Sequence, residues 1–281
     1  MDSQYFNDSN PYRRAFPRGL LQPKHGFRFS IDALLLACFA ACRAHHNVID
    51  LGTGCGVVGL GLLLLDSGRR SAREPFKVLG IDNNLEMVAI AQANAERLDF
   101  AKRFTAIHGN VEDISKIPEF QPGEYDAVLC NPPYRLAGQG RLPTNPARQS
   151  AMFEVDTQVE DFLRAAKQAL ATKGRMYMVY LPEHLSRLLQ HLAAASLAPK
   201  RLRLVHPHRD KPASLLLLEA VKGGKPGLSI APPLIVYHRV CTSAGQPVHQ
   251  TTDEALKFCP FLDCNSTRPV ATHTRLLEET P

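Results

Sequence analysis

A short apolar run that ends in a cluster of glycines constrains the fold of this chain more than any other feature. Residues 47–51 read as a buried strand that runs directly into GTGCG at residues 52–56, and a helix can begin near Val57. Glycines allow the tight turn and the close approach of backbone to a ligand that such a strand–loop–helix junction needs. The spacing is G-x-G-x-G and not the G-x-G-x-x-G of dinucleotide folds. We therefore expect an α/β unit with a ligand site at the loop, although an ordinary turn gives the same pattern.

The rest of the chain repeats this rhythm of short β-branched runs and amphipathic segments, which is typical of βαβ units around a parallel sheet. Helices are predicted over residues 31–44, with Ser30 as N-cap, and near residues 57–66, 84–98, 157–171 and 183–195. Strands are predicted at Asn47–Leu51, Lys77–Ile81, Phe104–His108, Tyr125–Cys130, Arg175–Tyr180, Arg201–Val205 and Ser214–Val221. Because only HPHRDKPA separates the last two strands, they should pair antiparallel. The predicted fold is α/β and Rossmann-like, with a seven-stranded, mostly parallel sheet that ends in an antiparallel hairpin.

The length of 281 residues suits one α/β domain with additions. Residues 1–18 show little apolar periodicity and contain Pro11 and Pro17, so we expect a flexible leader there, with local order near its end. One folded domain is predicted over residues 19–240, with a further short strand at residues 234–240. Residues 241–281 are predicted to form a C-terminal extension.

Composition excludes several classes of protein. Hydrophobic residues make up 44% and charged residues 21%, and no apolar run approaches the length of a membrane span. The N-terminus lacks the apolar centre of a secretory signal, and seven cysteines, an odd number, indicate reduced thiols and no disulfide framework. We expect a cytoplasmic protein that contacts no membrane. Its net charge of +6 is compatible with a polyanionic substrate.

Five residues of metal-ligating types occur near the C-terminus, at His238, Cys241, His249, Cys259 and Cys264. Their spacing lacks the paired C-x-x-C of zinc knuckles. We therefore expect no metal and interpret these residues as scattered reduced cysteines and histidines.

Polar side chains follow the second and third predicted strands. Asp82 ends the second strand, where a carboxylate can accept hydrogen bonds from both hydroxyls of a ribose. It lies beyond the usual spacing of about 20 residues from the loop, and the polar insertion at residues 66–75 accounts for the excess. After the third strand, either Asn110 or Asp113 can read an adenine amine. Each acid alone is as easily a solvated turn residue or cap, but three strand ends in order predict an adenosyl cofactor.

The fourth strand ends in Asn131-Pro132-Pro133-Tyr134, the most specific signal in the chain. An exocyclic amine attacks a methyl sulfonium poorly unless its two hydrogens are both accepted. The Asn131 side-chain oxygen and the Pro132 carbonyl can accept one each, and the prolines hold these acceptors in place. Tyr134 offers a face on which a flipped or unpaired base can stack. The alternative is that N-P-P only makes a tight turn after the strand.

With the glycine loop and NPPY, the chain resembles the class I N6-adenine and N5-glutamine methyltransferases. A narrower resemblance, over roughly residues 16–240, is to the bacterial tRNA(Val) adenine-37 N6-methyltransferase family. It is carried by QPKHGFRFSIDALLL at residues 22–36, NPPYRLAGQGRLP at residues 131–143 and HPHRDKPASLLLLEAVKGGKPGLSIAPPLIVY at residues 206–237. The resemblance implies a class I methyltransferase domain over residues 19–240 with S-adenosylmethionine as cofactor.

In such enzymes the segment before the first strand closes over the methionine end of the cofactor, which implies that Phe29 and Asp32 lie near it. A carboxylate at a helix start can face an ammonium, although Asp32 is equally a stabilising charge at the helix N-terminus. The predicted catalytic residues are Asn131, Pro132, Pro133 and Tyr134. The predicted cofactor-binding residues are Phe29, Asp32, Asp50, Gly52, Thr53, Gly54, Gly56, Asp82, Asn83, Asn110, Asp113 and Asn131.

Basic residues indicate where a tRNA anticodon stem-loop can bind. Many relatives place an aromatic residue where Arg135 stands here, so a second stacking surface is not expected. A first group lies in the long loop after NPPY, and Arg209, Lys211, Lys222 and Lys225 form a second around the terminal hairpin. The predicted substrate-binding residues are Tyr134, Arg135, Arg141, Arg148, Arg209, Lys211 and Lys225.

The pattern predicts transfer of a methyl group to N6 of adenosine 37 in a tRNA, and three alternatives stay open. One is N5-methylation of a glutamine in a translation release factor, since a carboxamide presents the same nitrogen; only about 45 residues precede the first strand, whereas such enzymes usually carry an N-terminal helical domain. Another is N6-adenine methylation of a different RNA. A third is a silent RNA-binding module, against which the intact Asn131, Asp82 and loop glycines argue.

Overall fold

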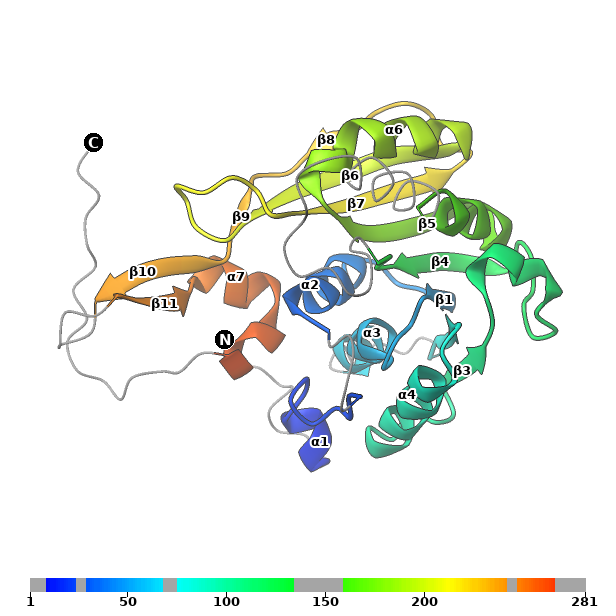
Figure 1. Ribbon diagram of the computed structural model, residues 1–281, viewed down its shortest axis with the longest axis horizontal. Coiled ribbons are helices and arrows are strands. Elements are labelled where there is room, and N and C mark those ends of the chain that lie inside the picture. The colour runs from blue at the N-terminus through cyan, green and yellow to red at the C-terminus, as the bar shows by residue number, and fades with distance from the viewer. Residues whose placement is uncertain (1–8, 24–28, 68–74, 134–158, 242–246, 266–281) are drawn as a thin grey trace, which may run out of the picture.

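A twisted, mostly parallel sheet forms the centre of the protein (Figure 1). The computed structural model describes residues 9–23, 29–67, 75–133, 159–241 and 247–265. Within them, the main sheet has nine strands in the order β3-β2-β1-β4-β5-β7-β6-β8, with β9 also paired to β6. These strands are β1 (Asn47–Leu51), β2 (Lys77–Asp82), β3 (Phe104–His108), β4 (Tyr125–Cys130), β5 (Leu170–Tyr180), β6 (Leu197–His206), β7 (Leu215–Lys222), β8 (Ser229–Ile230) and β9 (Leu234–Ile235).

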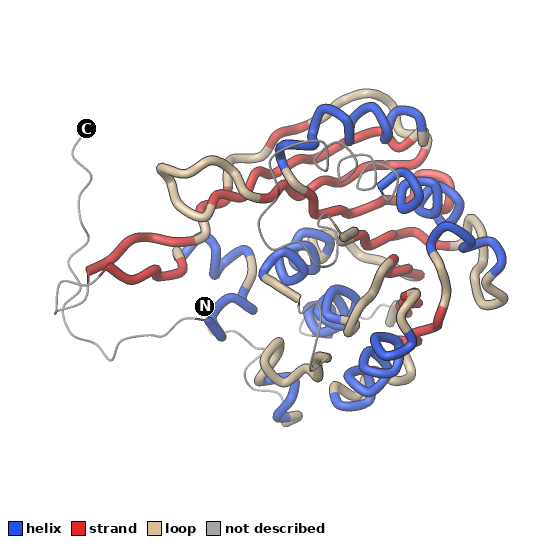
Figure 2. The backbone as a smooth tube through the Cα atoms, viewed as in Figure 1, coloured by secondary structure: helices blue, strands red, loops and turns tan. Residues whose placement is uncertain are grey.

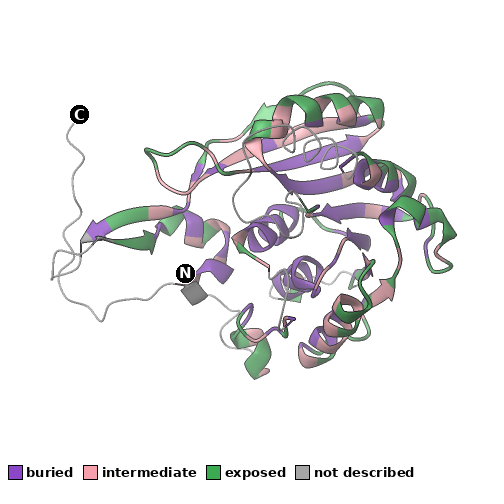
Figure 3. Cartoon of the chain, viewed as in Figure 1, coloured by how far each residue is buried: buried purple, intermediate pink, exposed green. Residues whose placement is uncertain are grey.

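Helices cover both faces of this sheet (Figure 2). Successive side chains on a strand point to opposite faces, so Val48 joins the core under one layer of helices while Ile49 and Leu51 join the core under the other. The first layer contains α2 (Ile31–Ala40), α3 (Val57–Ser67) and α4 (Leu85–Arg97), and the second contains η2 (Val111–Lys116), a helix over residues 159–169, and α6 (Leu185–Ala194), which follows η3 (Pro182–His184). The central strands, α2 and α3 are buried, and exposed residues gather on the outer helices (Figure 3).

The seven predicted strands are all present, and the predicted hairpin is confirmed, since β6 and β7 pair antiparallel. β1 to β5 are parallel where they pair with one another. The seven strands did not include β8 and β9, which run parallel to β6 at the sheet edge; β8 was not predicted, and β9 falls in the further short strand predicted after the hairpin. Pro232 and Pro233 separate them, because a proline has no N–H to donate to the ladder.

The short strand predicted over residues 234–240 is wrong in one respect, because it divides at Val236. Its first part is β9 in the main sheet, and its second part is β10 (Tyr237–Cys241), which pairs antiparallel with β11 (Pro247–Thr251) in a separate ribbon. After this ribbon, α7 (Asp253–Phe258) and η4 (Pro260–Asn265) return to the core of the domain. Within the predicted extension, α7 and η4 therefore pack on the same core.

Residues 9–18 carry local order, as expected near the end of the leader, and they pack on the domain more closely than the sequence predicted. A short helix, α1 (Pro11–Arg14), is capped by the Asn10 side chain, and the Arg13 Nε atom donates to the Leu98 carbonyl at 2.6 Å. Phe16 is buried and its ring centroid lies 4.7 Å from that of Phe261 in η4. Single buried side chains of this kind leave no periodic signal in a sequence, so the prediction missed them.

Helix α2 ends at Ala40, four residues earlier than predicted. The carbonyls of its last turn find side-chain partners instead of further helical N–H groups. His45 Nε2 lies 3.0 Å from the Ala40 carbonyl oxygen, and the Arg201 guanidinium donates to the Phe39 carbonyl oxygen at 3.0 Å. At the other end Ser30 holds the N-cap position, but its hydroxyl donates to Asp32 and does not accept a helical N–H.

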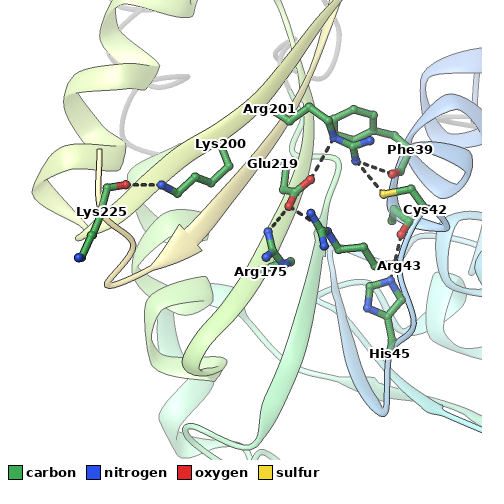
Figure 4. A network of polar contacts seen from close by, with 10 residues as sticks. Phe39, Cys42, Arg43, His45, Arg175, Lys200, Arg201, Glu219 and Lys225 are labelled. Carbon is green, nitrogen blue, oxygen red and sulfur yellow. Dashed lines mark hydrogen bonds and ion pairs between the residues drawn. The ribbon is translucent and has the colours of Figure 1, made fainter. Parts of the chain in front are cut away.

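A buried carboxylate ties α2 to the antiparallel end of the sheet (Figure 4). Glu219 on β7 is 1% exposed, and the guanidiniums of Arg43, Arg175 and Arg201 converge on it. The Arg201 guanidinium also stacks on the Phe39 ring at 3.8 Å from its centroid. The arginine side chains are partly exposed, so water can solvate them. Glu219 is buried, so water cannot take the place of its arginine partners.

We expect Glu219→Ala to lower the free energy of unfolding by about 3 kcal/mol, because it leaves three guanidiniums without their shared counter-charge beside the core. Glu254→Ala is the matched control, since that exposed carboxylate pairs with Arg203 at the surface and should cost less than about 1 kcal/mol. Urea unfolding of the full chain measures both. Equal midpoints for the two variants would contradict this account of the cluster.

Candidate functional site

The ends of four neighbouring parallel strands bring the predicted site residues to one edge of the sheet. Leu51 pairs with Ile81 on one side and with Cys130 on the other, and Asp82 pairs with His108. Each of these strand ends therefore carries one part of the predicted site. In the strand order β3-β2-β1-β4, these parts are the segment after β3, Asp82, the glycine loop and Asn131. Neighbouring strands lie about 4.8 Å apart, so Asn131 begins one strand away from the loop.

The glycine loop adopts a conformation that requires its glycines. Gly52, Gly54 and Gly56 have φ of +67°, +57° and +84°, values that side-chain-bearing residues rarely adopt. Apart from its two chain neighbours, none of the described residues has an atom within 4 Å of where a Cβ of Gly54 would stand. The backbone at Gly54 is thus open to an approaching ligand.

Asp50 and Thr53, both predicted to bind cofactor, lie beneath the loop and hold it in shape. Asp50 is 1% exposed, and its Oδ2 atom accepts from the Thr53 hydroxyl at 2.8 Å and from the Gly59 N–H at 3.1 Å. The Thr53 N–H donates to the Ile81 carbonyl. These contacts join the loop to the start of α3 and to β2, so the structure gives both side chains a positioning role.

Asp82 connects the loop to the start of α4. Its Oδ2 atom accepts from the Gly54 N–H at 2.8 Å, and its Oδ1 atom accepts from the Asn84 N–H at 2.9 Å. A carboxylate oxygen has a second lone pair, so each can still accept one hydroxyl. Asn83 is exposed beside it, with its carbonyl 3.2 Å from His108 Nε2.

The two residues proposed to read an adenine differ in their contacts. Asn110 caps η2, where its side-chain oxygen accepts from the Glu112 N–H at 3.2 Å, so its amide N–H groups stay available. Asp113 pairs with Lys116 at 2.9 Å. The Asn110 amide N–H groups can donate to an adenine ring nitrogen but cannot accept from the adenine amine. The Asp113 carboxylate can accept from that amine. Both residues follow the end of β3, so both alternatives stay open.

Phe29 and Asp32 lie at the start of α2. Phe29 is partly buried against the first core, and Asp32 is 2% exposed with its Oδ1 atom bound by the Ser30 hydroxyl and by the Ala33 N–H. A buried carboxylate with one oxygen still unused keeps an acceptor for a cation. Its predicted place near an ammonium stays a prediction.

The N-P-P segment continues directly from β4. Asn131 is partly exposed, Pro132 is buried and Pro133 is exposed, and among the described residues the Asn131 side chain has no hydrogen-bond partner. Burial raises the pKa of the neighbouring Cys130 thiol, and it raises the pKa of Cys55 in the loop to about 11. Both thiols therefore stay protonated at neutral pH, and Asn131 is a polar side chain at this strand end without a hydrogen-bond partner in the described part of the chain.

Two contributors to the site were not predicted. Phe162, on the helix over residues 159–169, lies so close to the loop that a Cβ at Gly52 would stand 3.2 Å from its ring. Asn84 caps α4 by accepting from the Glu86 N–H, which fixes the turn that follows Asp82. The sequence carried a signal only for Asn84, as an N-cap residue before a helix.

The described residues include only part of the two predicted basic groups. Tyr134, Arg135, Arg141 and Arg148 lie outside the described residues. Arg209 and Lys211 are exposed in the turn between β6 and β7, which lies at the same edge as Asn131, because Tyr180 at the end of β5 pairs with Leu216 at the start of β7.

Lys222 and Lys225 do not belong to that group, and the prediction of one basic group around the hairpin is wrong. They follow the other end of β7, whose eight residues span about 26 Å at 3.3 Å per residue. Lys222 donates to the Leu170 carbonyl at the start of β5, at the opposite edge of the sheet. Lys225 is therefore far from the glycine loop.

The site fits an adenosyl cofactor, since an open glycine backbone, a carboxylate with free lone pairs and a polar segment follow successive strands. The family model of the methyltransferase small domain matches residues 31–194. The chain belongs to this family. It is a methyltransferase with a class I, Rossmann-like fold, and its cofactor is S-adenosylmethionine.

Comparisons with individual proteins agree. The chain is 27% identical over 215 residues, 75% of its own length and 84% of the relative's, to the tRNA1(Val) (adenine(37)-N6)-methyltransferase of Parabacteroides distasonis. The protein of that name from Photobacterium profundum is 29% identical over 69% of this chain and 77% of its own. A solved structure, a predicted O-methyltransferase from Agrobacterium tumefaciens, superposes with a TM-score of 0.62 at 20% identity, over 82% of this chain and 96% of that one, which shows the fold alone.

Two further observations concern membranes and metals. Within the described ranges, no helix is long and apolar enough to cross a bilayer. In the same part of the chain, no three His, Cys, Asp or Glu side chains come together as metal ligands, and the side chains of Cys241 and Cys264 lie outside it.

Asp50 makes a testable contribution to stability. Desolvation raises its pKa from 3.8 to about 7, although the hydrogen bonds from Thr53 and Gly59 oppose the shift. Between these two values the folded protein keeps a proton that the unfolded chain releases, so stability falls as pH rises through this window and is level above it.

We expect Asp50→Asn to remove this loss, because the amide oxygen can accept the same two hydrogen bonds without a charge. Relative to the variant, the wild type should lose a few kcal/mol of stability between about pH 4 and about pH 7, at 1.36 kcal/mol per pKa unit. Urea unfolding across this range measures the difference. Parallel stability profiles for the two proteins would show that Asp50 is charged in the fold.

Proposed function

We propose that the protein methylates the exocyclic N6 of adenosine 37 in a tRNA, with a valine tRNA as the substrate, and yields N6-methyladenosine and S-adenosylhomocysteine. The observation that carries the proposal is the position of Asn131 and Pro132 one strand away from the cofactor loop, fixed by the pairing of Leu51 with Cys130. The names of the relatives support the choice of an adenine in tRNA. A tRNA substrate also supports the predicted cytoplasmic location.

S-adenosylmethionine supplies a methyl group on a sulfonium centre. The Asn131 side-chain oxygen and the Pro132 carbonyl each accept one hydrogen of the amine, which favours a pyramidal nitrogen with a directed lone pair. The surplus proton leaves after transfer, through the Asn131 contact to water, so no general base is needed. The Cys130 thiol, the one described thiol at this strand end, stays protonated and so cannot act as a base, which agrees with a reaction that needs none.

Contacts to the RNA come from two segments at this edge. Tyr134 is proposed to stack on the target base, and Arg135, Arg141 and Arg148 to meet phosphates from the loop that follows it. Arg209 and Lys211 add exposed positive charge from the turn between β6 and β7. We leave Lys225 out of this set because it lies at the opposite edge.

The runner-up function is methylation of a glutamine amide in a translation release factor, because Asn131 can hold a carboxamide in the same way. One assay separates the two. The purified chain is incubated with labelled cofactor and either unmodified tRNA or release factor, and the tRNA product is digested for mass spectrometry. We expect label in the tRNA as N6-methyladenosine; label on the protein substrate alone would exclude the tRNA assignment.

The two strand ends should fail in different ways when altered. Asn131→Ala is expected to lower kcat at least about 100-fold, the usual cost of losing one oriented polar group, while the Kd for cofactor changes little. Asp82→Ala is expected to weaken cofactor binding instead, because Asp82 holds Gly54 and the proposed ribose hydroxyls. Calorimetry with S-adenosylhomocysteine and single-turnover rates distinguish them, and equal losses of affinity in both variants would refute this division of roles.

A further inference from the structure

Three aromatic side chains meet where the β10–β11 ribbon contacts the turn between β6 and β7. His208 comes from the turn, Tyr237 from β10 and His249 from β11. The ring centroids of His208 and His249 are 4.7 Å apart, and that of Tyr237 lies 6.0 Å and 6.2 Å from them. We call these residues the His-Tyr cluster.

Two polar contacts fix the ribbon against the turn at this cluster. His208 Nδ1 lies 3.1 Å from the Tyr237 carbonyl oxygen, and Arg239 pairs with Asp210 at 3.0 Å. Arg239 and His249 are opposite each other in the ribbon, so both point to the face that carries Tyr237. The cluster is therefore held in place by the fold and is not a chance meeting of mobile side chains.

The cluster faces solvent on one side. His249 is exposed, while His208 and Tyr237 are partly buried beneath it. A core contact would have left all three buried, and a ribbon that only braced the sheet would need no exposed ring. The exposed imidazole offers a flat surface backed by two further rings.

The segments that form this surface carry more cations than carboxylates. Residues 206–213, 237–241 and 247–251 together contain three cations, Arg209, Lys211 and Arg239, and one carboxylate, Asp210. The same segments hold four histidines, His206, His208, His238 and His249. Rings interleaved with cations are the combination that binds unpaired nucleic acid, because bases stack and phosphates are neutralised.

The surface lies at the catalytic edge of the sheet. The strand order runs from β4 through β5 and β7 to β6, so β6 lies three strands from β4, and the turn after β6 leaves the sheet on the same side as Asn131. One tRNA molecule can contact both places.

We propose that the His-Tyr cluster is a second RNA-binding site, on which an unpaired base of the substrate stacks against His249 while Arg209, Lys211 and Arg239 contact adjacent phosphates. The inference rests on the proposed function, since it names another contact of the same RNA. It gives the ribbon, which lies outside the region matched by the family model, a role in substrate binding.

Binding and turnover of full-length variants test the inference. The probe is a transcript of the tRNA that the wild-type chain methylates, and its Kd is measured at fixed salt. His249→Ala should raise this Kd and KM about tenfold, as expected for loss of one stacked base, with kcat and the Kd for S-adenosylhomocysteine unchanged. His249→Phe, which keeps a flat ring, should retain most of the affinity.

His238→Ala is the matched control, because His238 is an exposed histidine on the opposite face of the same ribbon. It should leave RNA binding as in the wild type. Unchanged RNA affinity in His249→Ala, or an equal loss in His238→Ala, would overturn the inference while tRNA methylation by the wild type stands. A wild-type chain that methylates no tRNA would instead remove the proposed function, and this is seen before any variant is made.

Discussion

The parallel pairing of β1 with β4 is the constraint on which the site depends. It sets Leu51 beside Cys130, so the glycine loop and the N-P-P segment leave the sheet as neighbours. Parallel strands reach this arrangement only through crossovers that return the chain to the same edge, and here the helices on both faces supply them. A methyl donor bound at the loop and an amine held at Asn131 can meet because the sheet brings both strand ends together.

Two carboxylates hold the glycine loop in shape before a ligand binds. Asp50 lies buried beneath the turn and Asp82 beside it, and between them they bind Thr53, Gly54 and Gly59. A buried carboxylate is a costly support, as its raised pKa shows. The cost agrees with a loop whose three positive-φ glycines must keep one conformation in the absence of ligand.

The sequence predicted those parts of the structure that local patterns specify. Strand runs, the glycine loop and the polar residues after Asp82 each carry their own signal, and the register that unites them follows from a parallel sheet. Burial of the Asp50 side chain was not predicted from the sequence. Side chains alternate between the two faces along a strand, so Asp50 lies on the same face as the buried Val48, and this pattern could have predicted it.

Contacts between distant segments could not be predicted. The packing of Phe16 on Phe261 joins the two ends of the chain, and no local pattern records it. Lys211 and Lys225 are close in sequence, yet a strand between them carries them to opposite edges of the sheet. The His-Tyr cluster likewise arises only when the ribbon folds back onto the turn after β6.

A crystal structure of the protein with S-adenosylhomocysteine and adenosine tests the central claim most directly. The account predicts the ribose hydroxyls on Asp82, the sulfur beside the loop, and the adenosine amine bound by the Asn131 side-chain oxygen and the Pro132 carbonyl. An adenosyl group bound elsewhere, or an Asn131 side chain turned away from the amine, would contradict it.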